Sequence, residues 1–363
     1  MRIGLFAIAV SMVACGPIDS DKPTRHSSYP IVTTERGPQG GRLVFLAEDG
    51  RRMALLTDGE GGPVIDTNPA WSTDGKWVAF ASSRDRTALE QTSLWIVEGR
   101  SNSKPRRLTS EESVDRDPVW TVNGKALVFS SNVAGSFDLW LLPLTTGEDG
   151  WPAPAGTGKQ LTRSRFDELS PTLSPDGSRV VYMRYDRDTQ RSDLWSVSIR
   201  GGQPRKITRG PADLTPSFSP DGKAIAFAAP IKGRDDTELF VIEPDGSNRR
   251  AVVDEPLSDQ TGPRWSRDGR YLFATSVYRA ESTGRPILSS LVVVDLTESP
   301  RVMRALHDPV AVESRIGGAI APVDLDPEIL RRNELYSDAL KRTMVKKKKA
   351  DDDQNRTSDE TGP

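Results

Sequence analysis

The sequence predicts an all-β protein made of repeated four-stranded sheets, and two observations lead to this prediction. A motif that begins with proline, continues with a large apolar residue and serine or threonine, and ends in a glycine turn recurs along the chain. Its five turn glycines are spaced 49, 53, 45 and 47 residues apart: Gly75, Gly124, Gly177, Gly222 and Gly269. The 30 glycines and 27 prolines among 363 residues also indicate many turns between short strands. A unit repeated at this period is typical of a β-propeller, where each unit forms one blade.

Each unit is expected to contribute four strands. In the second unit, Pro118–Thr121 begins the first strand, Ala126–Phe129 is the second, Asp138–Leu141 is the third and Gln160–Thr162 belongs to the fourth. The turn between the first two strands is usually Asp-Gly, which allows a positive φ and lets the carboxylate accept nearby amide hydrogens. One such sheet cannot bury both faces, so neighbouring blades must stack around a ring.

The two ends of the repeat region are expected to share one blade. Arg42–Leu46 and Met53–Thr57 flank an Asp-Gly pair and match the third and fourth strands of a unit. A degenerate sixth copy at Ser314–Ala321 matches the first and second strands. The prediction is therefore a six-bladed propeller over residues 41–324, with the last blade closed by strands from both ends.

The segments outside the repeats have distinct compositions. Residues 1–14 resemble a bacterial lipoprotein signal peptide, since Arg2 precedes a short apolar run that ends at the single cysteine, Cys15. This resemblance implies lipidation of Cys15 at the outer membrane; an ordinary secretory signal with an incidental cysteine is the alternative. Residues 15–40 are expected to form a flexible tether, 325–350 a short C-terminal helix and 351–363 a disordered tail.

The repeats resemble a known family. The run Pro69–Lys76, together with the Asp-Leu-Trp of third strands such as Asp193–Trp195, is similar to the WD40-like PD40 repeats of the TolB family. The resemblance extends over residues 41–324. It implies a periplasmic propeller that acts through protein–protein contacts, although propellers of prolyl-oligopeptidase-type enzymes have similar blades.

A series of acidic residues forms the candidate binding site. Each residue stands three or four positions before the proline of a repeat: Asp66, Asp115, Glu168, Asp213 and Asp259. In a propeller this position lies near the mouth of the central channel, where a ring of carboxylates could hold a cation or a basic side chain of a partner. The alternative is that each carboxylate caps its own turn through local amides.

The remaining chemistry is restricted by what the sequence lacks. There is no Gly-x-Ser-x-Gly nucleophile motif, there are only two histidines, and a net charge of −2 gives no footprint for nucleic acid. We therefore expect a monomeric, non-enzymatic scaffold without metal or cofactor. It would bind an envelope protein or peptide while the lipid on Cys15 anchors it to the outer membrane, facing the periplasm. The alternative function is a small-ligand or cation-binding propeller, including a lactonase-type or lyase-type enzyme.

Overall fold

The computed structural model describes a chain of short antiparallel strands. The described residues are 31–37, 40–46, 52–57, 64–101, 103–234, 236–255, 258–266, 268–279, 286–299, 301–305, 310–311 and 316–317. Within these ranges, no helix is both long and apolar enough to cross a bilayer. The signal peptide, Cys15, the expected helix at 325–350 and the tail at 351–363 lie outside the described residues.

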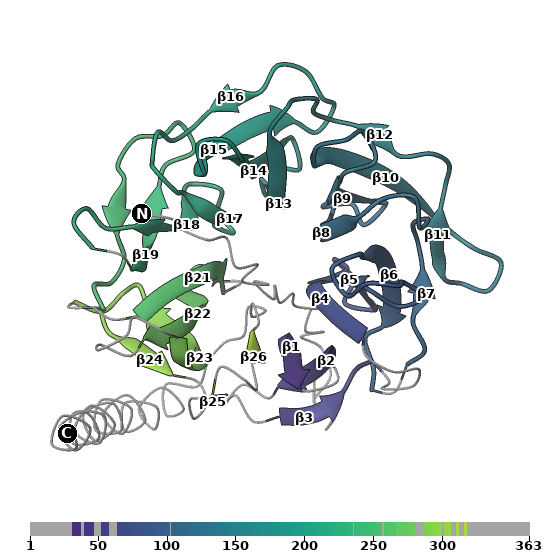
Figure 1. Ribbon diagram of the computed structural model, residues 1–363, viewed down its shortest axis with the longest axis horizontal. Coiled ribbons are helices and arrows are strands. Elements are labelled where there is room, and N and C mark those ends of the chain that lie inside the picture. The colour runs from purple at the N-terminus through teal and green to yellow at the C-terminus, as the bar shows by residue number, and fades with distance from the viewer. Residues whose placement is uncertain are drawn as a thin grey trace, which may run out of the picture.

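Five sheets follow one another around a common centre, each with its first strand innermost (Figure 1). Blade one consists of β4 (Val64–Trp71), β5 (Trp77–Ser82), β6 (Ser93–Glu98) and β7 (Arg106–Arg107). Blade two consists of β8 (Asp115–Trp120), β9 (Ala126–Ser131), β10 (Asp138–Thr146), β11 (Pro152–Pro154) and β12 (Lys159–Gln160). Blade three consists of β13 (Asp167–Leu173), β14 (Arg179–Asp186), β15 (Arg191–Ser198) and β16 (Arg205–Lys206).

The last two of these sheets complete the series. Blade four consists of β17 (Leu214–Phe218), β18 (Ile225–Pro230), β19 (Thr237–Ile242) and β20 (Arg250–Ala251). Blade five consists of β21 (Ser258–Trp265), β22 (Tyr271–Arg279), β23 (Pro286–Asp295), β24 (Met303–Ala305) and β25 (Val310–Ala311). The expected order of four strands, with the turn motif between the first and second, is confirmed in all five.

The chain ends meet in one further group of strands, the terminal sheet. It contains β26 (Ile316–Gly317), β1 (Ile31–Gly37), β2 (Gly40–Leu46) and β3 (Arg52–Leu55), paired in that order. The prediction of a flexible tether through residue 40 is wrong for β1, which pairs with β2 along its whole length. The expected division into two strands from each end is wrong for the same reason: β1 takes the position between β26 and β2.

Residues 31–37 form a strand because, although several of them are polar, the first four are good strand formers. Ile31, Val32, Thr33 and Thr34 are β-branched and favour a pleated, half-buried surface. Val32 and both threonines are completely buried. At the other end of the hairpin, Gly40 has φ of 108° and an added Cβ would lie 2.0 Å from the Val64 carbonyl oxygen, so only glycine fits where the terminal sheet touches β4.

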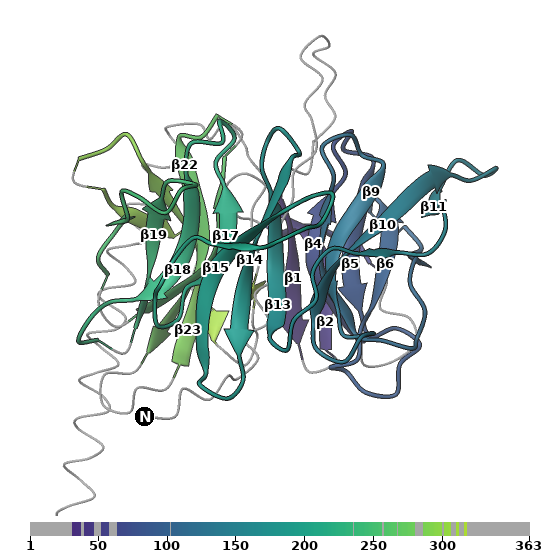
Figure 2. The same cartoon turned by 90° about the horizontal axis from the view of Figure 1, so that it is seen from above.

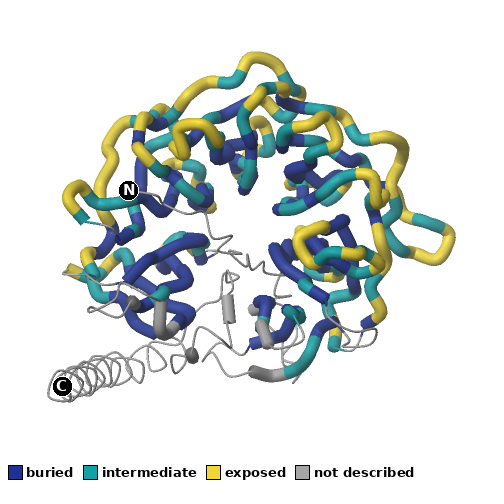
Figure 3. The backbone as a smooth tube through the Cα atoms, in the orientation of Figure 1, coloured by how far each residue is buried: buried dark blue, intermediate teal, exposed yellow. Residues whose placement is uncertain are grey.

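The apolar cores lie between neighbouring sheets rather than within them. Phe45 and Leu56 of the terminal region pack with Trp71, Phe80 and Trp95 of blade one. Four similar clusters join blades one and two, two and three, three and four, and four and five. Each fully buried aromatic side chain contributes roughly 1.5–3 kcal/mol, so these contacts hold the ring together. Figure 3 shows the same division, with buried residues toward the inner strands and exposed residues on the outer loops.

The strands run between two edges of the propeller, seen from the side in Figure 2. We call the edge where the innermost strands begin the start edge; the loops from second to third strands also lie there. The opposite edge, called the turn edge, carries the Asp-Gly turns. At Asp74 the carboxylate accepts from the Ser72 hydroxyl at 2.5 Å and from the Lys76 amide at 3.1 Å, as the turn motif predicts.

Candidate functional site: buried carboxylates at the start edge

The acidic series lies at the start of the innermost strands but is closed off from solvent. Asp66, Asp115, Glu168 and Asp213 are at most 1% exposed and Asp259 is 6% exposed. Within the described part of the chain, no three His, Cys, Asp or Glu side chains are placed to hold a metal ion. Each of these carboxyls therefore lies at a different interface between neighbouring sheets.

Asp66 shows how such a carboxylate is satisfied. Its Oδ2 accepts from the Thr57 hydroxyl at 2.7 Å and from the Arg84 guanidinium at 2.7 Å, and its Oδ1 accepts from the Ser82 hydroxyl at 2.6 Å. Thr57 follows the terminal sheet, whereas Ser82 ends β5. The carboxylate thus links two neighbouring sheets through side chains, and not through amides of its own turn as the capping alternative proposed.

The threonine is a repeated partner that sequence reasoning missed. Thr57 also accepts from the Leu43 amide of its own sheet at 3.1 Å. The same contact, from a third-strand amide to a hydroxyl after the fourth strand, recurs at 2.9 Å in three blades: Leu94 to Thr109, Leu139 to Thr162 and Leu194 to Thr208. The signal was present in the repeats as Leu-Thr or Ile-Thr pairs shortly before four of the five acids, Asp66, Asp115, Glu168 and Asp213.

Asp115 and Asp213 keep this arrangement. Burial raises the pKa of Asp115, while hydroxyls of Ser131 and Thr109 oppose the shift. Burial also raises the pKa of Asp213, against the stabilising effects of the Thr208 hydroxyl and the Arg249 guanidinium, which donates at 3.0 Å. In both cases a hydroxyl from the preceding blade partly compensates for lost hydration.

Glu168 differs because its partner on the second strand is an arginine. Arg184 donates to Glu168 Oε1 from Nε at 3.2 Å and from Nη2 at 2.9 Å, and Ser164 donates to the same oxygen at 3.1 Å. Glu168 Oε2 is buried without a hydrogen-bond partner in the described structure. Blade three therefore places a guanidinium directly across the strand pair from its acid, whereas the guanidinium that pairs with Asp66 comes from Arg84, two residues beyond Ser82.

In blade five the position that the acid occupies in the other blades, three residues before the repeat proline, is held by Gln260 and not by the predicted Asp259. Gln260 stands three residues before Pro263 and is completely buried. With its nitrogen placed toward two nearby oxygens, its amide donates to Glu238 Oε2 at 2.6 Å and to the Thr237 carbonyl at 2.7 Å. Asp259 instead accepts from the Thr237 amide at 3.1 Å. The position corresponding to the repeated threonine is Val253, so the amide takes over the link between sheets.

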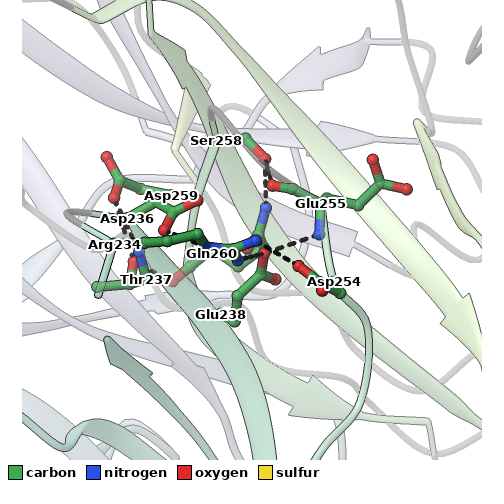
Figure 4. A network of polar contacts seen from close by, with 9 residues as sticks. All are labelled: Arg234, Asp236, Thr237, Glu238, Asp254, Glu255, Ser258, Asp259 and Gln260. Atoms are coloured by element: carbon green, nitrogen blue, oxygen red, sulfur yellow. Dashed lines mark hydrogen bonds and ion pairs between the residues drawn. The ribbon is translucent and has the colours of Figure 1, made fainter. Parts of the chain in front are cut away.

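Glu238 is the centre of a dense polar network between blades four and five (Figure 4). Its Oε1 accepts from Arg234 at 2.9 Å and from the Glu255 amide at 2.7 Å. Arg234 also pairs with Asp236 at 2.9 Å and with Asp254 at 2.5 Å. Burial raises the pKa of Glu238 to about 8, and the charges of Asp236 and Asp254 act in the same direction, against Glu255 and Arg234. One guanidinium is thus shared among three carboxyls.

A second set of missed residues lies two positions further along each innermost strand. These residues directly precede the repeat prolines and have φ between 48° and 64°: Asn68, Asp117, Ser170, Thr215 and Gly262. Asp117 accepts from the Ser170 amide at 3.0 Å, and Thr215 accepts from the Gly262 amide at 3.2 Å. A bulge in each first strand turns a short side chain toward the next blade. The signal available in the sequence was the small or polar residue before each proline.

Charges also interact across the centre of the ring. Asp117 lies in β8 and Arg264 in β21, which face each other in Figure 1. Burial raises the pKa of Asp117, and the cations Arg116 and Arg264 oppose this shift. Burial lowers the pKa of Arg264 to about 10, with Asp117 opposing. The innermost strands therefore carry opposite charges on opposite sides of the axis.

Repeated four-stranded sheets, cores between neighbours and links along the innermost strands define this molecule as a repeat β-propeller. Residues 155–290 match the PD40 family, described as the TolB beta propeller domain. Residues 155–290 therefore carry TolB-like PD40 repeats, as their turn motifs indicate.

Three known proteins place this assignment in context. The Tol-Pal system protein TolB of Francisella tularensis subsp. mediasiatica is 24% identical over 233 residues, which is 62% of this chain and 51% of that protein. The uncharacterized peptidase YuxL of Bacillus subtilis is 30% identical over 110 residues, 29% of this chain and 16% of that protein. The solved structure of putative TolB from Agrobacterium tumefaciens has a TM-score of 0.58 at 21% identity, covering 76% of this chain and 90% of that one. The chain spans about half the length of the TolB relatives that it matches.

Proposed function

We propose that this chain is a non-enzymatic scaffold of the cell envelope that binds another envelope protein or peptide. In this proposal β26 and β1–β3 form a sixth blade that closes the ring, and the lipid on Cys15 holds a monomer at the outer membrane, facing the periplasm. The TolB relatives support a role in protein contacts. The peptidase among the relatives aligns with 29% of this chain, and the sequence contains no Gly-x-Ser-x-Gly motif.

One observation carries the proposal: the carboxylates of the acidic series are buried and form hydrogen bonds inside the fold. Asp66 alone receives three hydrogen bonds from neighbouring side chains, and each other carboxyl of the series contacts a residue of a neighbouring strand or sheet. We therefore propose that these residues fasten blades to each other and do not bind a cation. The cation, lactonase or lyase alternative depended on the same residues and loses its motivation.

The start edge is the surface that we propose for partner binding. Leu89 and Val133 are large apolar side chains with 39% and 51% of their surface exposed, and both lie on loops from second to third strands in adjacent blades. Val122 is 49% exposed but lies in the turn after the first strand, at the opposite edge. This difference in position gives the experiment a matched control.

A photo-crosslinking amino acid at position 89 or 133, in the full chain within intact cells, tests the proposal. We expect a discrete cross-linked protein from the start edge and a much weaker product from position 122. Fractionation of a Cys15→Ser variant tests the anchor, because loss of the lipid should move the chain from the membrane to the soluble fraction. Products that are equal at both edges, or absent from both, would contradict partner binding at the start edge.

A further inference from the structure

Blade three departs from the repeat at the position that faces the acidic residue. Asp66 is paired across the strands with Ser82, and Glu168 is paired across the strands with Arg184. A short hydroxyl is thus replaced by a long cation, and the carboxylate is one methylene longer. Differences between repeats are where a repeat protein can encode a specific contact, because the shared residues serve the shared geometry.

The Arg184 side chain is only partly used by the fold. Its Nε and Nη2 bond to Glu168, its guanidinium lies 3.9 Å from the centre of the Trp195 ring, and its side chain is 15% exposed. Neither bond to Glu168 uses Nη1, and the guanidinium also lies near the buried Tyr182 hydroxyl, whose raised pKa it opposes. The bonds to Glu168 and the contact with the Trp195 ring together fix the orientation of the guanidinium.

Arg184 lines a groove of about 630 Å³ between blades two and three. The groove also exposes a second guanidinium, side-chain amides and apolar surface, contributed by Arg163, Gln160, Gln203, Trp195 and Pro204. Arg163 is exposed and donates to the Gln160 side-chain oxygen at 3.0 Å. The nearby carboxyls of Asp138 and Glu168 are buried beneath these groups. The charge accessible in the groove is therefore positive.

The sequence shows the same polarity on a larger scale. Residues 159–209 contain eleven Lys and Arg against six Asp and Glu, whereas the whole chain contains 49 against 51. Residues 210–255, which include blade four, contain five basic residues against nine acidic ones. Blade three is thus a basic sector beside an acidic one, an arrangement that attracts and orients an oppositely charged partner.

We propose that this groove binds an acidic, extended segment of a protein partner, with Arg163 and Arg184 receiving its carboxylates. The inference rests on the proposed scaffold function and assigns it a site and a ligand chemistry. A peptide fits better than a phosphate or sulfate group, because the exposed Gln203 side chain can both donate to and accept from peptide amides, while Gln160 is already bonded to Asp138 and Arg163. Trp195 and Pro204 offer apolar surface for an intervening side chain, which a simple anion would not use.

Fluorescence anisotropy with a labelled decapeptide of alternating glutamate and threonine tests this site on the full chain at low salt. The double variant Glu168→Asp, Arg184→Ser rebuilds the Asp115–Ser131 pair that blade two uses, so it removes the cation and leaves the buried carboxylate with hydroxyl partners. We expect binding about tenfold weaker in this variant and in Arg163→Gln. Arg179→Gln removes an exposed charge of the same blade at the turn edge and should change binding by less than about twofold.

Three results would overturn the site: no binding by the unaltered chain, equal binding of a lysine–threonine peptide, or equal loss in Arg179→Gln. Binding of phosphatidylglycerol vesicles that needs Arg163 and Arg184, without peptide binding, would instead identify a membrane contact. Cross-linking from position 133 in the double variant separates the two proposals. If the groove fails while that product persists, the scaffold function stands; if the product is absent from the unaltered chain, the scaffold function itself fails.

Discussion

At the scale of single residues, a buried carboxylate is stable only when its donors are in place. Thr57 provides such a donor, since it links the Leu43 amide to Asp66 across two sheets. Thr57→Val keeps the shape of the side chain and removes the hydroxyl, so we expect the free energy of unfolding to fall by about 2 kcal/mol. Urea denaturation measures the change. Thr87→Val, at an exposed position, is the control, and equal midpoints for the two variants would refute the role of Thr57.

Glu238 should make stability fall as pH rises. Its folded pKa of about 8 lies above the ordinary value of 4.5, because burial disfavours the charged form. Between these values the folded state holds a proton that the unfolded state has released, so its stabilising effect is complete below pH 4.5 and lost by about pH 8. Glu238→Gln imitates the protonated form. We expect this variant to flatten the decline of Tm over that interval, and an unchanged slope would show that Glu238 is already ionised.

These residues also show how far a sequence predicts a site. The positions of Asp66, Asp115, Glu168 and Asp213 before each proline were visible, and so was their common place at the start of the innermost strands. Their partners were not, because Thr57 and Arg84 come from other strands whose register the sequence does not state. Gln260 was missed because an amide does not belong to an acidic series, although it stands at the same distance from its proline.

At the scale of elements, the turn motifs predicted five sheets correctly because Asp-Gly turns have strict conformational requirements. β1 was missed because it lacks such a turn and contains polar threonines that pack inside the terminal sheet. The strand is held by seven residue pairs with β2 and by two with β26. Its contribution is therefore set by tertiary pairing, which local composition does not reveal.

Truncation distinguishes a tether from a strand. A chain that begins at residue 30 keeps β1, and a chain that begins at residue 38 lacks it. We expect the free energy of unfolding of the shorter chain to be lower by about 3 kcal/mol or more. The reason is that Val32 is removed from the core and the edge of β2 that pairs with β1 loses its partner. Thermal unfolding followed by circular dichroism measures the difference. Similar Tm values for both chains would show that residues 31–37 do not stabilise the fold and act only as a tether.

At the scale of the whole molecule, the interfaces make neighbouring sheets depend on each other. Each core cluster is shared by two sheets, and the buried carboxylates fasten the same interfaces. In an open row of repeats, stability is a sum of local terms and an end can unfold alone. In a closed ring, no sheet has a free face, so local losses are shared by the whole circle.

A pair of distant substitutions tests closure. Thr57→Val weakens the joint between the terminal sheet and blade one, and Thr208→Val weakens the joint between blades three and four. Six of the eight tryptophans lie at or before position 151, so their fluorescence reports mainly on blades one and two, whereas circular dichroism reports on all sheets. If the ring is closed, Thr208→Val should lower the free energy of unfolding by about 1–2 kcal/mol. The urea midpoints measured by fluorescence and by circular dichroism should then fall equally. In a chain that ends at residue 305, which lacks both β25 and β26, the two midpoints should separate, because blade five and the terminal sheet are no longer joined. Separate midpoints already in the longer chain would mean that the ring is open.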